Sequence, residues 1–215
     1  MPFMLFSKHS YYSFLFSLKV AIAQLPSFGG VGGGLLLFLF TNSLSAQTAW
    51  RQYRTDDKAL TIKMPKDWSA EENFENYPLF LQSPYKDKDD HFAENICFYL
   101  QKIAQNPAKK VLEDYMTETR KQFPKILTDL KMSEVRYFDL KGKTACEMVC
   151  THQQGNDVLK WKQVNVLKDD TMISITFTAL VKTYEEYSAT ADKIIESVVS
   201  DPVSASGQTL KKDKM

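Results

Sequence analysis

The amino-acid sequence predicts an α+β fold in which an antiparallel β-sheet is sandwiched by helices. Between Met172 and Leu180, apolar residues alternate with serine and threonine, which is the period-two pattern of a half-buried strand. Residues 184–198 then place apolar side chains three and four positions apart, as in a helix with one apolar face. Earlier strands follow one another through short turns, so neighbouring strands must run antiparallel.

The sequence also predicts how the final strand and helix pack against each other. The strand presents one apolar side, formed by Ile173, Ile175, Phe177 and Ala179. Thr183 is placed to cap the helix, and Glu186, three residues on, is placed to complete a capping box. We expect the apolar stripe of the helix to cover this strand; it consists of Tyr184, Tyr187, Ala191, Ile194, Ile195 and Val198.

Four strands are expected before the first helix: Trp50–Thr55, Leu60–Met64, Tyr77–Gln82 and Ala93–Ile103. Asp56-Asp57 is a turn signal, and Pro65 ends the second strand because proline cannot donate to a strand ladder. Trp68 is expected to fold back onto the edge of the sheet.

The first helix is expected to start at Asn106 as cap, with Pro107 at the first helical position. Its buried stripe is predicted to consist of Leu112, Tyr115, Met116, Thr119 and Phe123. Pro124 ends or kinks it, and residues 126–130 are predicted to add a further helical turn. Three strands follow, Ser133–Leu140, Lys143–Gln153 and Val158–Leu167, with turns at Gly142 and Gly155.

The chain divides into a signal peptide at 1–46, one domain at 47–200 and a disordered tail at 201–215. The first 46 residues carry two lysines and no acidic residue, and they contain the apolar run Leu35–Phe40. Small residues up to Ala46 suit cleavage. The apolar run is shorter than the about 20 residues that span a membrane. Two alternatives remain open: an uncleaved N-terminal anchor, and a start codon assigned too early.

Charge excludes some partners of the mature chain. The residues after Ala46 carry 25 basic and 26 acidic side chains, because Lys8 and Lys19 precede the cleavage point. A net charge of about −1 offers no basic excess to hold nucleic acid or an anionic membrane surface. We therefore expect no nucleic-acid partner and no membrane span after cleavage, and we expect a monomer.

Three segments resemble the PsbP-like and DcrB-like family: Leu60–Trp68, Phe92–Ile96, and Ile173–Thr178 together with Ile194–Val198. The resemblance implies the PsbP-type α-β-α sandwich. It also implies an exported, secreted or periplasmic protein that acts as a non-catalytic binding or assembly module of the cell envelope. The expected partner is another envelope protein, and no enzyme activity or cofactor is expected. The Ran-binding role of some members conflicts with the signal peptide.

One row of residues could carry metal chemistry: Cys146, Met148, Cys150 and His152 share a face of a predicted strand. Thiolate and imidazole ligands suit zinc or copper. Strand geometry places Cys146 and His152 about 20 Å apart, so only Cys150 and His152 could share an ion. We expect this face to be packed in the core without metal. The alternative function is a small envelope hydrolase or metal-binding protein that uses Cys150, His152 or His91.

The remaining candidates favour structural roles. Cys97 could pair with Cys146 or Cys150 if their strands are neighbours, but free buried thiols are favoured. An acidic loop is predicted to be solvated, because it has no glycine at the bend that a calcium loop needs; it contains Asp87, Asp89, Asp90, His91 and Glu94. Four aromatic residues could form a partner-binding surface, although core packing is favoured for most: Tyr99, Tyr137, Phe138 and Trp161.

We predict export with cleavage after Ala46, because the apolar run Leu35–Phe40 is followed by small residues. N-terminal sequencing of the protein purified from its native host should begin at Gln47. A chain that begins before residue 40 would contradict cleavage.

Overall fold

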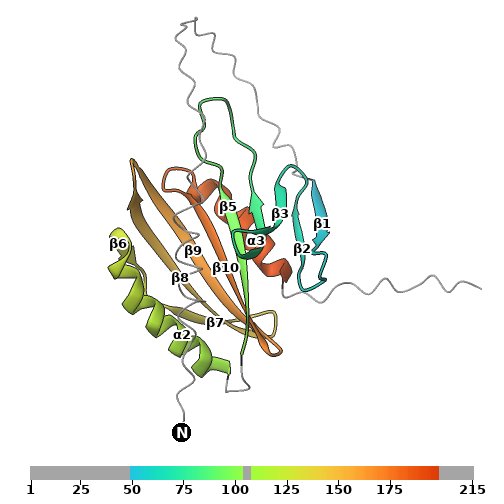
Figure 1. Cartoon of the computed structure of the whole chain (residues 1–215), viewed down its shortest axis with the longest axis vertical. Coiled ribbons are helices and arrows are strands. Elements are labelled where there is room, and N and C mark those ends of the chain that lie inside the picture. Colours follow the sequence, from blue (N-terminus) through green and yellow to red (C-terminus); the bar gives the residue numbers. More distant parts are fainter. Residues whose placement is uncertain (1–48, 104–107, 199–215) are drawn as a thin grey trace, which may run out of the picture.

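The computed structural model describes residues 49–103 and 108–198. The predictions for residues 1–46 and 201–215, and for the helix start at Asn106 and Pro107, fall outside these ranges. The α+β class is confirmed, since the described chain forms an antiparallel sheet with two α-helices (Figure 1).

A two-stranded ribbon precedes the main sheet and consists of β1 (Trp50–Arg54) and β2 (Thr61–Pro65). The first strands of the main sheet are β3 (Ser69–Phe74), β4 (Tyr77–Gln82) and β5 (Asn95–Lys102). Helix α2 (Ala108–Gln122) and the 3₁₀ turn η1 (Phe123–Lys125) follow. The chain then forms β6 (Thr128–Met132), β7 (Arg136–Leu140), β8 (Lys143–Gln154), β9 (Asp157–Lys168), β10 (Thr171–Leu180) and helix α3 (Tyr184–Val198).

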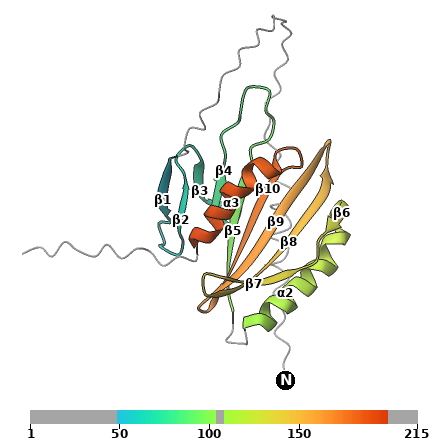
Figure 2. The ribbon, with the colours of Figure 1, turned by 180° about the vertical axis from the view of Figure 1, so that it is seen from behind.

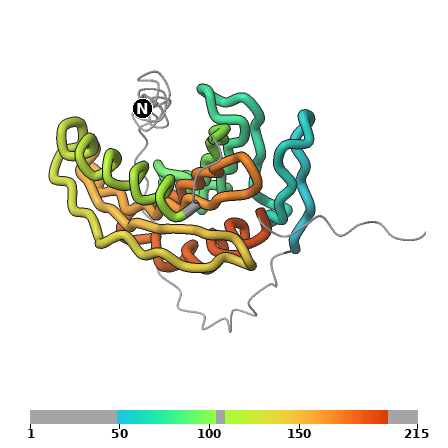
Figure 3. Tube along the Cα trace, turned by 90° about the horizontal axis from the view of Figure 1, so that it is seen from below, coloured from blue at the N-terminus to red at the C-terminus, as the bar shows by residue number. Residues whose placement is uncertain are grey.

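The main sheet has eight strands in the order β3-β4-β5-β10-β9-β8-β6, and β7 also pairs with β8. All pairings are antiparallel. Helix α3 and the β1–β2 ribbon lie on one face of this sheet, and α2 lies on the other, across β8 and β9 (Figures 1, 2 and 3).

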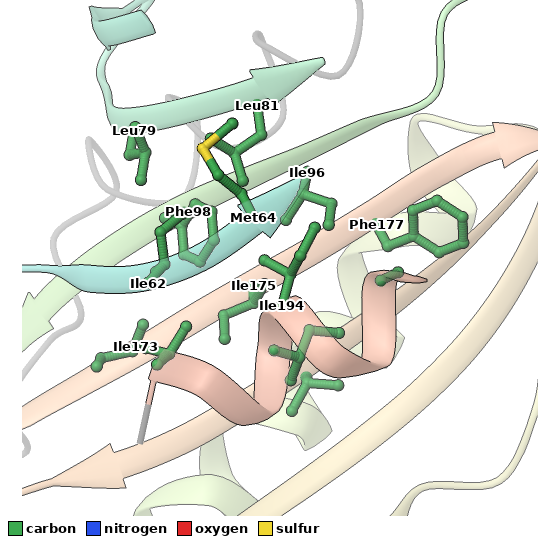
Figure 4. Close-up of a cluster of buried hydrophobic side chains, with 14 of the residues drawn as sticks. Ile62, Met64, Leu79, Leu81, Ile96, Phe98, Ile173, Ile175, Phe177 and Ile194 are labelled. Carbon is green, nitrogen blue, oxygen red and sulfur yellow. The ribbon is translucent and has the colours of Figure 1, made fainter. Parts of the chain in front are cut away.

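The larger core lies between the sheet and α3. The predicted apolar side of β10 and the predicted stripe of α3 meet there, which confirms both assignments. Phe177 is fully buried, and its ring centroid lies 5.2 Å from that of Tyr184. Figure 4 shows β2, β4, β5, β10 and α3 contributing to one cluster; the labelled side chains are Ile62, Met64, Leu79, Leu81, Ile96, Phe98, Ile173, Ile175, Phe177 and Ile194.

The prediction that β10 is half-buried is wrong. Ser174 and Thr176, on the side opposite Ile175, are each 1% exposed, and Thr178 is 6% exposed. The strand order explains this, because β10 lies between β5 and β9 in the middle of the sheet and both faces are covered. The alternation of polar and apolar residues in β10 therefore separates two buried faces, one in each core, and does not separate a core face from a solvent face.

Two segments differ from their predicted structure. Residues 69–74 form the edge strand β3, which the sequence analysis missed because polar residues occupy its exposed positions, Ser69, Glu71 and Asn73. The helical turn predicted at 126–130 is wrong, since Thr128–Met132 is strand β6 on the edge of β8. Asp129 has φ 51° at a break in the β6–β8 register, and this bulge hides the strand pattern.

One strand boundary and one helix cap also differ. The strand predicted to begin at Ser133 begins at Arg136. The predicted capping box at α3 is replaced by contacts to the 83–94 loop. The Thr183 hydroxyl donates to Glu94 Oε1 at 2.5 Å, and Glu186 forms an ion pair with Lys86 at 2.5 Å.

Phe177→Ala should lower the free energy of unfolding by about 3–5 kcal/mol, because it leaves a cavity at a fully buried site as well as losing apolar transfer energy. Urea unfolding of the protein purified from its host measures this change. The control is removal of the chain after Asp201, which should leave the midpoint unchanged. Equal midpoints for Phe177→Ala and the natural protein would contradict the core position of this strand.

Candidate functional site

The row predicted on one face of β8 lies in the smaller core, under α2. Cys146, Met148 and Cys150 are at most 1% exposed, and His152 is 2% exposed. The expected burial of this face is therefore confirmed. Burial raises the pKa of the Cys146 thiol to about 11 and that of Cys150 to about 12, so both stay protonated at neutral pH.

Hydrogen bonds occupy both ring nitrogens of His152. The Trp161 indole donates to Nδ1 at 3.2 Å, and Nε2 lies 3.3 Å from the Gln154 side-chain oxygen. This pattern fits a neutral imidazole that donates through Nε2, and burial lowers the His152 pKa in the same direction. His152 could ligate an ion only by giving up one of these bonds.

The other candidate groups serve the fold. His91 Nε2 lies 3.1 Å from Asp157 Oδ1 and ties the 83–94 loop to the β8–β9 hairpin. Side chains of the acidic loop accept hydrogen bonds from the loop's own backbone. The Asp90 carboxylate, for example, accepts hydrogen bonds from the backbone N–H groups of Lys86 and Phe92. Across residues 49–103 and 108–198, no three His, Cys, Asp or Glu side chains are grouped as metal ligands.

A disulfide from Cys97 is excluded by the strand order. Cys97 lies on β5, whereas Cys146 and Cys150 lie on β8, and β10 and β9 separate the two strands. Three strand spacings amount to about 14 Å, against a limit of about 7 Å between bridged Cα atoms. All three cysteines are free and buried, as the sequence favoured.

The four aromatic candidates do not form one surface. Trp161 is buried against Phe123 under α2, and Tyr99 is half-buried on the same side. Phe138 packs on the opposite core, where Arg136 lies over its ring. Tyr137 is 38% exposed, with Lys109 near its ring. The partner-binding surface that would unite them is therefore absent.

The structure instead brings together a group of buried polar side chains that the sequence analysis did not identify. We call it the central polar cluster; it consists of Cys97, Tyr115, Gln163, Asn165, Ser174 and Thr176. All of them lie on the α2 side of β5, β9 and β10, except Tyr115, which reaches the sheet from α2. The only sequence signal is that Gln163 and Asn165 interrupt the apolar positions of β9.

Several members of this cluster bond to one another. Gln163 Nε2 donates to the Tyr115 hydroxyl at 3.3 Å and to Asn165 Oδ1 at 3.4 Å. Asn165 Nδ2 contacts the Met116 sulfur at 3.2 Å and the Cys146 sulfur at 3.8 Å. The Cys97 thiol donates to the Thr176 carbonyl at 3.7 Å, and burial raises its pKa to about 12. The cluster is therefore uncharged.

Three buried atoms in the cluster have no hydrogen-bond partner within the described part of the chain: Gln163 Oε1, Ser174 Oγ and Thr176 Oγ1. Burial raises the pKa of the Tyr115 phenol, and the Ser174 hydroxyl beside it lowers that pKa by a smaller amount. An unsatisfied buried polar group costs about 1–3 kcal/mol. Such groups are uncommon in folded proteins, and here all three lie on two adjacent central strands.

Comparison with known proteins identifies the fold. No family model and no curated protein matches the chain. Among solved structures, cyanobacterial PsbP (CyanoP) from Synechocystis sp. PCC 6803 aligns with a TM-score of 0.51 at 13% identity, covering 80% of this chain and 96% of CyanoP. LpqN of Mycobacterium tuberculosis, a protein involved in cell envelope biogenesis, gives 0.53 at 16% identity, covering 68% and 87%. The chain thus has the PsbP-like fold that its sequence motifs indicated.

We expect the purified protein to contain well under one equivalent of zinc or copper, because His152 is hydrogen-bonded at both nitrogens and the thiols are protonated. Elemental analysis of protein purified from its host measures this content. One equivalent of either metal, lost in a Cys150→Ala, His152→Ala double variant but kept in Cys97→Ala, would contradict the structural role of this row.

Proposed function

We propose that the protein is a non-catalytic binding or assembly module exported to the cell envelope, where it binds another envelope protein. The observation that carries the proposal is an exposed apolar pair at one end of the sheet, Val158 and Val181. Val158 is 47% exposed and Val181 is 46% exposed. The backbone N–H of Val181 donates a hydrogen bond to the carbonyl oxygen of Val158 at 3.0 Å. The pair extends the β9–β10 ladder beyond Leu159 and Leu180.

The end that carries this pair is held rigid. Phe92, Leu159 and Leu180 form a small buried cluster beside it. Lys86 bonds to Glu186, and Glu94, only 1% exposed, accepts the hydroxyls of Ser83 and Thr183. A rigid surface loses little conformational entropy on association, which favours protein binding.

The side chains that would perform nucleophilic chemistry support a non-catalytic role. The thiols are protonated and buried, and His152 is neutral with both nitrogens bonded. Nucleophilic catalysis requires an accessible nucleophile beside a base. The export part of the proposal rests on the signal-peptide pattern of residues 1–46. In the described residues, no helix is both long enough and apolar enough to cross a membrane.

The proposal is tested by capture of envelope proteins from the host with the tagged protein and with a Val158→Lys, Val181→Lys double variant. The two lysines would place positive charges inside an apolar interface with the partner. We therefore expect the variant to capture at least tenfold less of one envelope protein than the natural protein does. The matched control, Lys121→Glu on the exposed side of α2, should capture the same amount as the natural protein. Equal capture by the double variant would contradict this surface.

A further inference from the structure

We propose that β7 is an interaction surface at which this strand pairs, antiparallel, with β7 of a second copy of the chain. The contact is separate from the Val158–Val181 pair, because β7 pairs with residues 143–147 at one end of β8, whereas Val158 lies opposite Gln153 at the other end. The proposal departs from the monomer expected from the sequence, since the position of β7 at an edge of the sheet depends on strand order.

The outer side of β7 is unpaired within the described part of the chain. The strand pairs with β8 along all of its residues, from Arg136 to Leu140, and with no other described strand (Figure 2). Its surroundings are open, because Arg136 and Asp139 are exposed and Tyr137 is 38% exposed. An edge strand of this kind presents backbone N–H and C=O groups that can pair with another strand.

The other two edge strands of the main sheet are interrupted, whereas β7 is regular. In β3, Asn73 has φ 58°, and the register with β4 skips this residue. In β6, Asp129 has φ 51° at a shift in the register with β8. Irregularities of this kind protect an edge from pairing with another chain. β7 contains no proline, glycine or left-handed residue, and its pairs with β8 are consecutive, so it is the edge best suited to accept a strand.

The turn after β7 determines which of its backbone groups point outward. The turn residues Lys141-Gly142 have φ 51° and 80°, as in the two-residue type I′ turn that joins two hydrogen-bonded strands. Leu140 and Lys143 flank this turn and are paired with each other. Since hydrogen-bonded and non-hydrogen-bonded pairs alternate along an antiparallel ladder, Tyr137 and Asp139 direct their N–H and C=O groups away from β8. These two residues would bond to the second strand.

The geometry of β7 is compatible with pairing to itself. When two copies of the strand pair over their full length, a two-fold axis passes between the two Phe138 residues. Tyr137 then lies opposite the partner's Asp139, so outward-facing groups meet, and each such pair exchanges two hydrogen bonds. The two Phe138 side chains form a non-hydrogen-bonded pair, the arrangement with the closest side chains, in which aromatic pairs are stabilising.

The charges on and beside β7 complement those of a second copy. Lys109 Nζ lies 5.9 Å from the centroid of the Tyr137 ring. The proposed pairing places the partner's Asp139 opposite Tyr137, which brings a carboxylate toward this lysine. Arg136 lies opposite the partner's Leu140 and can keep its ion pair with Glu147, which measures 2.9 Å. Like charges directly opposite each other would destabilise the pairing, and the residues of β7 create no such contact.

Sedimentation velocity over a dilution series of the protein purified from its host tests the dimer. A contact through one five-residue strand is small for a stable interface, so we expect a reversible dimer that dissociates on dilution. A monomer at every concentration would overturn the proposal.

Two substitutions at Tyr137 separate backbone pairing from side-chain contact. Tyr137→Pro removes an outward N–H without removing a bond to β8, and proline is tolerated at such a position of an edge strand. We expect this variant to keep the natural circular dichroism spectrum and to stay monomeric at concentrations at which the natural protein dimerises. Tyr137→Ala, the matched control, keeps the N–H and should still dimerise. Equal dimerisation of the proline variant and the natural protein would show that β7 does not pair in this way.

A cysteine trap tests the register. Phe138→Cys places two thiols at the two-fold axis with Cα atoms about 4.5 Å apart, within the range of a disulfide. Oxidation with diamide should therefore convert most of this variant to a covalent dimer, seen by non-reducing electrophoresis. In the control Arg136→Cys, the two thiols would stand about 13 Å apart along the strands, beyond the limit of about 7 Å, and should not link. The natural cysteines are buried and do not compete. No link through residue 138, or equal links in both variants, would overturn the proposal.

Discussion

The strand β10 pairs with β5 along one edge and with β9 along the other, and its two faces serve different cores. Its odd-numbered residues from Ile173 to Ala179 pack under α3, whereas its even-numbered residues face α2. β10 therefore lies in the middle of the main sheet and contributes to both cores. Loss of packing at Phe177 would therefore disturb the sheet, α3 and the β1–β2 ribbon together.

The two cores differ in chemistry. The core under α3 is apolar and is closed by aliphatic and aromatic side chains. The core under α2 contains thiols, thioethers, amides and hydroxyls as well as Phe123 and Trp161. Because β10 lies in the middle of the sheet, its hydroxyl groups cannot turn toward solvent. A polar side chain at such a position can find a partner only within the protein, as Gln163 does in Tyr115 and Asn165.

Charged residues organise the periphery. Lys86, His91 and Glu94 fix the 83–94 loop to α3 and to the β8–β9 hairpin. On the α3 side, Lys162 bonds to Asp192 and Lys160 to Glu185, so α3 is also tied to β9. These contacts leave Val158 and Val181 on a rigid end of the sheet, which is the surface a protein partner would meet. The PsbP-like fold supplies the scaffold, and these particular side chains would supply the specificity.

The sequence by itself determined the class of fold, the β10–α3 unit and the burial of the Cys146–Cys150 face, because these depend on periodicity within one element. It missed β3 and misassigned residues 126–130, since an edge strand needs only one neighbour and carries a weak pattern. Only the tertiary structure decided that two strands separate Cys97 from Cys146 and that Gln163 faces Thr176. Both facts depend on strand order and register, which arise from contacts between residues far apart in the chain.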